Sequence, residues 1–136
     1  MREIPVGTKG SYTFIVSRDQ LASSASASQP HVLGTPVMSL AMELAAMAAI
    51  EPYLESSEIS VGATMKIEHL APTPEGYKVC AHAEVTKAQG RRIEFRVRAA
   101  DDIEEIGTGT HGQAVLERVK FDERLNSKMS ARKIAT

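Results

Sequence analysis

The strongest hydrophobic pattern in the chain is Pro36–Glu51, where apolar side chains fall on nearly every side of a helix. Thr35 is a suitable N-cap, and Pro36 fits the first helical position because its missing N–H would have no partner there. Pro52 disfavours helix at the residue before it, so the helix is expected to end at about Glu51. A helix that is apolar all round is expected to be buried on most sides.

Most of the remaining chain alternates polar and apolar residues with a period of two, which is typical of strands. A first strand is predicted before the helix, and four more are predicted after it: Ser11–Val16, then Ile59–Leu70, Tyr77–Lys87, Ile93–Ala99 and Ile103–Val119. Consecutive strands joined by short turns favour an antiparallel meander. Glycines in the last range predict a bulge or a close backbone approach.

These elements predict an α+β protein of the hotdog type, in which about five antiparallel strands wrap around one long central helix. The 136 residues suit a single domain over 1–136, and the charged tail after about residue 121 is expected to fray or to form a short surface helix. One sheet covers only part of an all-apolar helix. We therefore expect a homodimer, or an assembly of such dimers.

The segment Ala22–Pro30 consists almost entirely of Ser and Ala and has no bulky apolar side chain. It predicts a mobile loop. The loop is either a plain linker or a flexible cover over a site.

Composition narrows the class of protein. A formal net charge of -1 argues against nucleic acid as a partner, because phosphate binding needs a basic surface. No apolar run approaches the roughly 20 residues of a membrane helix, and the N-terminus lacks the apolar core of a signal peptide. The single Cys predicts no disulfide, and no pair of histidines has metal-ligand spacing. We expect a cytoplasmic protein with no metal site and no membrane contact.

Polar residues inside the apolar helix are the first candidates for chemistry. Thr35, Ser39 and Glu43 lie at i, i+4 and i+8, so they form one stripe on a single side of the helix. Glu43 either faces a site there or points to solvent. Gly62, in the next predicted strand, either relieves crowding against the helix or lets a ligand approach the backbone.

Three histidines fall in the predicted strands. His69 lies at the end of its strand and means little alone. His82 is expected on the polar face of its strand, and His111 has no obvious partner in the sequence.

The order of these motifs resembles the fluoroacetyl-CoA thioesterase branch of the hotdog-fold acyl-CoA thioesterases. The resemblance runs from about Val6 to Phe121, and these stretches carry it: Thr35-x7-Glu43, Pro52-Tyr53-Leu54-Glu55, Ser60-Val61-Gly62, His69 with Ala71-Pro72-Thr73-Pro74-x-Gly76, Gly90-Arg91-Arg92, and Glu105-Ile106-Gly107-x-Gly109-Thr110-His111. It implies that the catalytic Thr, Glu and His of the family fall on Thr35, Glu43 and His69. A glycine of the family's active site falls on Gly62, as a substrate-binding residue.

The chain departs from that family at two places. Ser26–Gln29 replaces aromatic residues that precede the catalytic Thr, and Gly112-Gln113 follows the Gly-Thr-His where the family has an Arg. The resemblance therefore implies a thioesterase of this family without its fluoroacetyl speciality.

The implied reaction is hydrolysis of a small or medium acyl-CoA to the free acid and CoA, with no cofactor because CoA is part of the substrate. The helix N-terminus near Thr35 is expected to offer free N–H groups to the oxyanion. Thr35 is then the nucleophile or a positioning group. Glu43 is a nucleophile, a base for water, or the residue that orients His69. The alternatives are a non-catalytic acyl-CoA-binding module and a hotdog hydratase or dehydratase.

Overall fold

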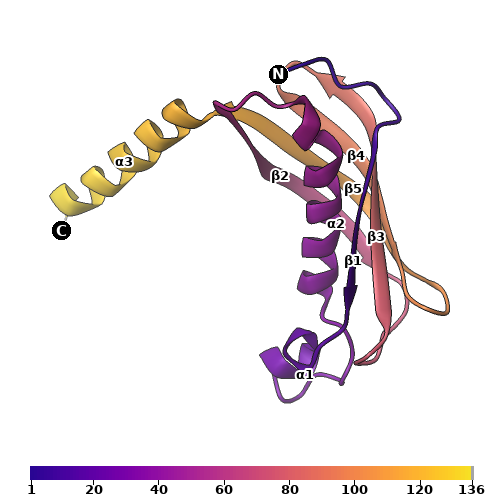
Figure 1. Ribbon diagram of the computed structural model, residues 1–136. Coiled ribbons are helices and arrows are strands. Elements are labelled where there is room, and N and C mark those ends of the chain that lie inside the picture. Colours follow the sequence, from indigo (N-terminus) through magenta and orange to yellow (C-terminus); the bar gives the residue numbers. More distant parts are fainter. Residues whose placement is uncertain (136) are drawn as a thin grey trace.

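A curled antiparallel sheet wraps around one long helix in the computed structural model, which describes residues 1–135 (Figure 1). The helix is α2 (Thr35–Ile50). The five strands are β1 (Lys9–Ile15), β2 (Glu58–His69), β3 (Lys78–Gln89), β4 (Arg92–Ala100) and β5 (Glu105–Glu117). This is the predicted α+β arrangement, and each strand boundary lies within about two residues of its predicted position.

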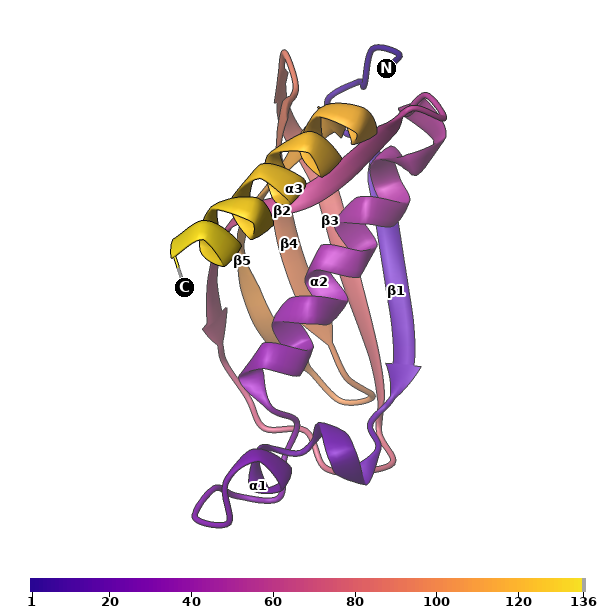
Figure 2. The same cartoon turned by 90° about the vertical axis from the view of Figure 1, so that its left-hand side faces the viewer.

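The strand order in the sheet is β1-β3-β4-β5-β2. Only β3, β4 and β5 form the predicted meander, and the prediction that β2 joins it as a neighbour of β3 is wrong. β2 pairs with β5 at the far side of the sheet, so the chain from β2 to β3 passes across the end of the sheet (Figure 2). β2 is therefore an edge strand, and its outer backbone has no neighbour among residues 1–135.

Helix α2 begins one residue earlier than the sequence predicts. Gly34 is the N-cap and Thr35 is the first helical residue, so Thr35 does not cap the helix. The backbone N–H of Gly34 donates to the carbonyl of Gln20 at 2.9 Å, and this bond fixes where the helix starts. The helix ends at Ile50, as Pro52 requires, and a short 3-10 turn follows at Glu51–Tyr53.

The core lies between α2 and the concave face of the sheet. The helix contributes mostly alanines and methionines, and strands β3 and β4 contribute every second residue: Met38, Ala41, Met42, Ala45, Ala46, Ala49 and Ile50, with Val79, Ala81, Ala83, Val85, Ile93, Phe95, Val97 and Ala99. Since alanine extends no further than Cβ, the helix can approach the sheet closely. The approach is close at Gly10 of β1, where a methyl group would stand 2.6 Å from the Ala49 nitrogen and would overlap the Ala45 carbonyl oxygen.

Two further segments differ from their predictions in detail. The Ser/Ala segment begins with a single helical turn, α1 (Ala22–Ala25), and a bridge between Leu21 and Leu33 joins the two ends of the segment. The tail forms α3 (Arg118–Ala135), an 18-residue helix that projects away from the sheet (Figure 1) and is longer than the short helix expected. Within residues 1–135, no helix combines the length and the apolar composition needed to span a membrane.

Replacing Gly10 with Ala is expected to lower the free energy of unfolding by about 2–3 kcal/mol, because the added methyl meets helix backbone that cannot rotate away. Urea denaturation followed by circular dichroism measures this change. Ser11→Ala, at the next and exposed position of the same strand, is the control and should change stability little. Equal midpoints for the two variants would contradict the close approach.

Candidate active site

Thr35 and His69 meet at the N-terminal end of α2. Thr35 is the first residue of that helix and His69 the last residue of β2, and the Thr35 Oγ1 lies 2.8 Å from the His69 Nδ1. The other ring nitrogen, Nε2, is buried and has no hydrogen-bond partner among residues 1–135. Burial lowers the pKa of His69, and the nearby backbone of Ala71 opposes this more weakly. The ring is therefore neutral at neutral pH, and its Nδ1 can accept the hydroxyl proton of Thr35.

Most of the expected free N–H groups at this helix end are already paired. Gly34 donates to Gln20, Val37 donates to the carbonyl of Gly34 at 3.0 Å, and Pro36 has no N–H. Of the residues Gly34 to Val37, only Thr35 has a backbone N–H without a partner within residues 1–135. Thr35 thus brings together a hydroxyl, a free backbone donor and the positive end of the helix dipole.

Glu43 belongs to a second group of residues, two helical turns further along α2. Its carboxylate lies against the bare backbone of Gly62, so closely that a methyl group on Gly62 would overlap the Glu43 Oε1. The side chain is half-buried and faces β2. A hollow of about 250 Å³ opens here, with Thr64, Met65 and His111 among its lining residues.

A single chain does not bring Thr35, His69 and Glu43 together. Thr35 and Glu43 are eight residues apart, which is about 12 Å along a helix axis. The polar stripe predicted on one side of the helix lies along β2. Thr35 contacts His69 at the end of that strand, and Glu43 contacts Gly62 within it. The structure pairs His69 with Thr35 rather than with Glu43.

Sequence reasoning missed the surroundings of His111. The sequence shows no obvious partner for this residue, but in the structure its Nδ1 lies 2.7 Å from the Thr64 carbonyl oxygen and its Nε2 lies 2.9 Å from the Gln113 amide nitrogen. Its ring also stacks on Phe95. The available signal was the two-residue spacing of His111 and Gln113, which places both on the concave face of β5, but the glycines around them concealed the alternation.

A larger hollow, of about 390 Å³, opens beside Thr35 at the end of α2. The Ser/Ala segment supplies part of its wall through Ala22, Ser24 and Ala25, and Val37 of α2 supplies another part. The segment therefore borders the candidate site, which favours a cover over a plain linker.

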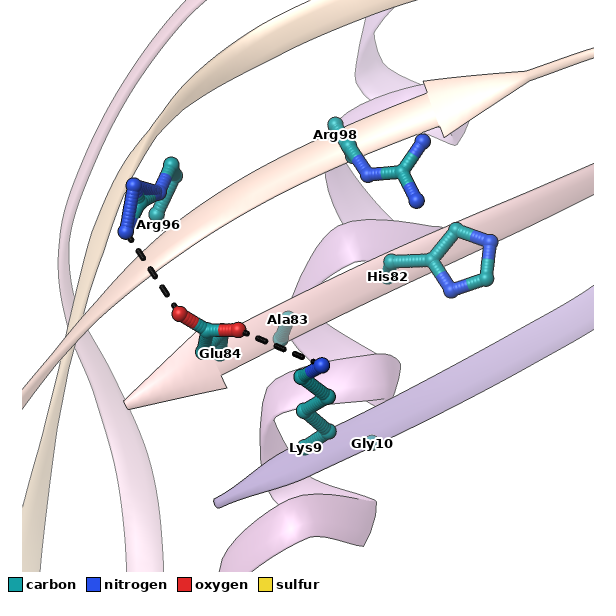
Figure 3. Close-up of a pocket in the computed structure, with 7 residues that line it drawn as sticks. All are labelled: Lys9, Gly10, His82, Ala83, Glu84, Arg96 and Arg98. Atoms are coloured by element: carbon teal, nitrogen blue, oxygen red, sulfur yellow. Dashed lines mark hydrogen bonds and ion pairs between the residues drawn. The ribbon is translucent and has the colours of Figure 1, made fainter. Parts of the chain in front are cut away.

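The hollow on the outer face of the sheet contains none of the predicted site residues (Figure 3). His82 lies there, on the polar face as predicted. Glu84 stands between two cations, 3.7 Å from the Lys9 Nζ and 3.5 Å from an Arg96 nitrogen. These partly exposed ion pairs form a surface charge network, far weaker evidence for chemistry than the buried groups beside α2.

Comparison with known proteins identifies the family. The model for the fluoroacetyl-CoA-specific thioesterase family matches residues 16–119. The chain belongs to this family. The fluoroacetyl-CoA thioesterase of Streptantibioticus cattleyicolor is 41% identical over 102 residues, which span 75% of this chain and 73% of that protein.

Solved structures agree with this family assignment. A crystal structure of a fluoroacetyl-CoA thioesterase superposes with a TM-score of 0.87 at 35% identity, and covers 93% of this chain and 98% of its own. A thioesterase superfamily member from Thermus thermophilus gives a TM-score of 0.91 at 30% identity over 100% of both chains. The predicted hotdog fold is confirmed.

The half-buried ring of His69 is expected to make folding sensitive to mild acid. Its pKa is lowered in the folded state, so the unfolded chain binds the proton first as pH falls through about 6.5, and stability is lost there. Between pH 7.5 and pH 5, the free energy of unfolding should therefore fall less in His69→Asn than in the parent. Urea titrations at several pH values measure this difference, and parallel pH curves would contradict it.

Proposed function

We propose that this protein is an acyl-CoA thioesterase that hydrolyses a small acyl-CoA to the free acid and CoA. The observation that carries the proposal is the Thr35–His69 hydrogen bond, made beside a free backbone N–H and an open hollow. An acyl-transfer site needs a group that moves protons and a hydrogen-bond donor for the oxyanion. Here His69 and the Thr35 N–H would supply them. The homologous enzyme from Streptantibioticus acts on fluoroacetyl-CoA by name, which supports a small acyl group.

The proposed reaction begins when the thioester carbonyl lies at the N-terminus of α2. Attack by water, or by an oxygen of the protein, forms a C–O bond and places negative charge on the carbonyl oxygen, where the Thr35 N–H can donate to it. When water attacks, the proton that it gives up passes through His69 to the leaving thiolate of CoA as the intermediate collapses and the C–S bond breaks. When an oxygen of the protein attacks, the same collapse leaves an acyl-enzyme, which water hydrolyses to the free acid in a second step. Removing one such oxyanion donor in other enzymes costs about 2.7–4 kcal/mol in the barrier.

Glu43 and Gly62 complete the proposed site. The carboxylate would act as the nucleophile or as the base that activates water, and the absence of a side chain at Gly62 leaves room for it and for the substrate. The small residues that border the hollow beside Thr35 would accept an acyl group without the aromatic contacts expected in the fluoroacetyl specialist. No cofactor is proposed, because CoA belongs to the substrate, and the proposed location is the cytoplasm.

Replacing Glu43 with Gln is expected to lower kcat by about 100-fold, because the amide keeps the volume but can neither attack nor accept a proton. The assay measures free thiol released from a panel of short-chain and aryl acyl-CoAs. Glu51→Gln, an exposed position just past the end of the same helix, is the matched control and should keep full activity.

The same assay separates the other two functions. Tight binding of acyl-CoA without thiol release by the parent protein would favour a binding module. A change in double-bond absorbance would favour a hydratase. Unchanged turnover in Glu43→Gln would show that the carboxylate has no chemical role.

We propose further that the protein is a homodimer whose two sites are shared between subunits. Two features support this: the unpaired edge of β2, and the exposed apolar side chains of α2, Leu40 at 51% and Met47 at 37%. A twofold axis perpendicular to two neighbouring α2 helices makes them antiparallel. Glu43 of each subunit would then face the Thr35–His69 pair of the other subunit. The two groups, which lie about 12 Å apart along the helix of one chain, would meet across the interface.

Mixing two inactive variants tests the shared site. Glu43→Gln and His69→Asn subunits, unfolded together and refolded, should regain about a quarter of the parental activity, because half of the dimers are mixed and each has one intact site. Either variant refolded alone is the control. Failure to regain activity, or sedimentation of the parent at its 14.7 kDa monomer mass, would contradict the proposal.

A further inference from the structure

Two polar side chains lie buried beneath Glu43 without a place in the proposed reaction. His111 is 3% exposed and Gln113 is fully buried, and both point from β5 toward the concave side of the sheet. Gln113 pairs in register with Gly62, the residue against which the Glu43 carboxylate lies. Polar groups are seldom buried in this way without hydrogen bonds, so their partners show which form each group adopts.

The partners of His111 fix its proton. The Nδ1 lies 2.7 Å from the carbonyl oxygen of Thr64, and a carbonyl can only accept, so Nδ1 carries the hydrogen. In the neutral ring Nε2 is then an acceptor, and the amide nitrogen of Gln113 donates to it at 2.9 Å. Both ring nitrogens are occupied, and a second proton on the ring would point at an amide N–H.

Gln113 itself shows how closely the ring and the amide are coupled. Its Oε1 is buried and has no hydrogen-bond partner among residues 1–135. A turned amide would let this oxygen accept from a protonated Nε2, but only if His111 became a cation. The charge of the His111 ring and the orientation of the Gln113 amide therefore change together, between two states.

The environment of His111 favours the neutral state. Burial lowers the pKa of His111, while the hydrogen bond to Thr64 and the charge of Glu43 act in the opposite direction. Glu43, on α2, is the charged group that acts on the ring. Met65 on β2 and Phe95 on β4, which lie opposite His111 in the two neighbouring strands, bring no charge.

The state of the ring matters because it borders the Glu43 carboxylate. At the point where Gly62 would bear a side chain, the Glu43 carboxyl carbon is 3.1 Å away and the His111 Cε1 is 3.7 Å away. A protonated His111 at this place would pair with the Glu43 carboxylate and make it a poorer base and nucleophile. A neutral ring leaves the negative charge of the carboxylate uncompensated.

We propose that Gln113 is a positioning residue: its amide holds His111 as the neutral, Nδ1-protonated imidazole, and this keeps the Glu43 carboxylate free to react. The proposal rests on the proposed thioesterase activity only for its last step. The state of the ring is a property of the protein without substrate.

The test uses long-range proton–nitrogen NMR of the histidine rings together with steady-state kinetics. The parent should show His111 neutral and protonated at Nδ1 at pH 7. In Gln113→Glu, which can only accept at Nε2, both ring nitrogens should be protonated, and kcat should fall about 10-fold with KM within twofold of the parent. In the near-isosteric Gln113→Met the ring loses its donor, so kcat should fall more steeply than in the parent as pH drops from 8 to 6.

Val115→Ala is the matched control, since it removes buried packing on the same strand without touching the ring, and its kcat and pH profile should stay parental. An Nε2-protonated ring in the parent, a neutral ring in Gln113→Glu, or full kcat in that variant despite a charged ring would each overturn the role of Gln113. A parent with the expected ring but no thiol release would instead overturn the proposed hydrolysis, and with it the use of Glu43.

Discussion

A helix that is apolar on almost every side must be covered on almost every side, and this constraint organises the molecule. The sheet curls because it has one rod to enclose, and the alanines of α2 let the strands come close enough to enclose it. One curled sheet still leaves a strip of the helix open, where Leu40 and Met47 are exposed. The cover is therefore incomplete within one chain, and this supports the proposed dimer (Figure 2).

Against this apolar background, a few polar groups are confined to one side of the helix. Thr35 and Glu43 both face β2, and each meets it at a different point, His69 for one and Gly62 for the other. The two histidines near these residues differ in whether their ring nitrogens have hydrogen-bond partners. The buried Nε2 of His69 is unpartnered among residues 1–135 and so is available to move a proton, whereas both nitrogens of His111 are occupied.

The sequence allowed the elements and the fold to be predicted because periodicity is a local property. Strand order depends on contacts between distant segments: β2 pairs with β5 at one edge of the sheet, and no residue near Leu70 signals a crossover rather than a hairpin. Thr35, His69, Glu43 and Gly62 could be named from the resemblance, but which of them meet depends on how β2 lies along α2. Gln113 could not be found from the sequence, because its role depends on which atoms of His111 and Thr64 it faces.

Gly10 gives the fold a further property. It touches no group of the candidate site and lies on the opposite side of α2 from β2, yet it sets how far the helix stands from the sheet. A rigid helix pushed away at this strand shifts both Thr35 and Glu43 relative to their partners. Natural selection for turnover would therefore act on a position that contacts no substrate, and a survey of tolerated substitutions that scored activity alone would place Gly10 among the site residues.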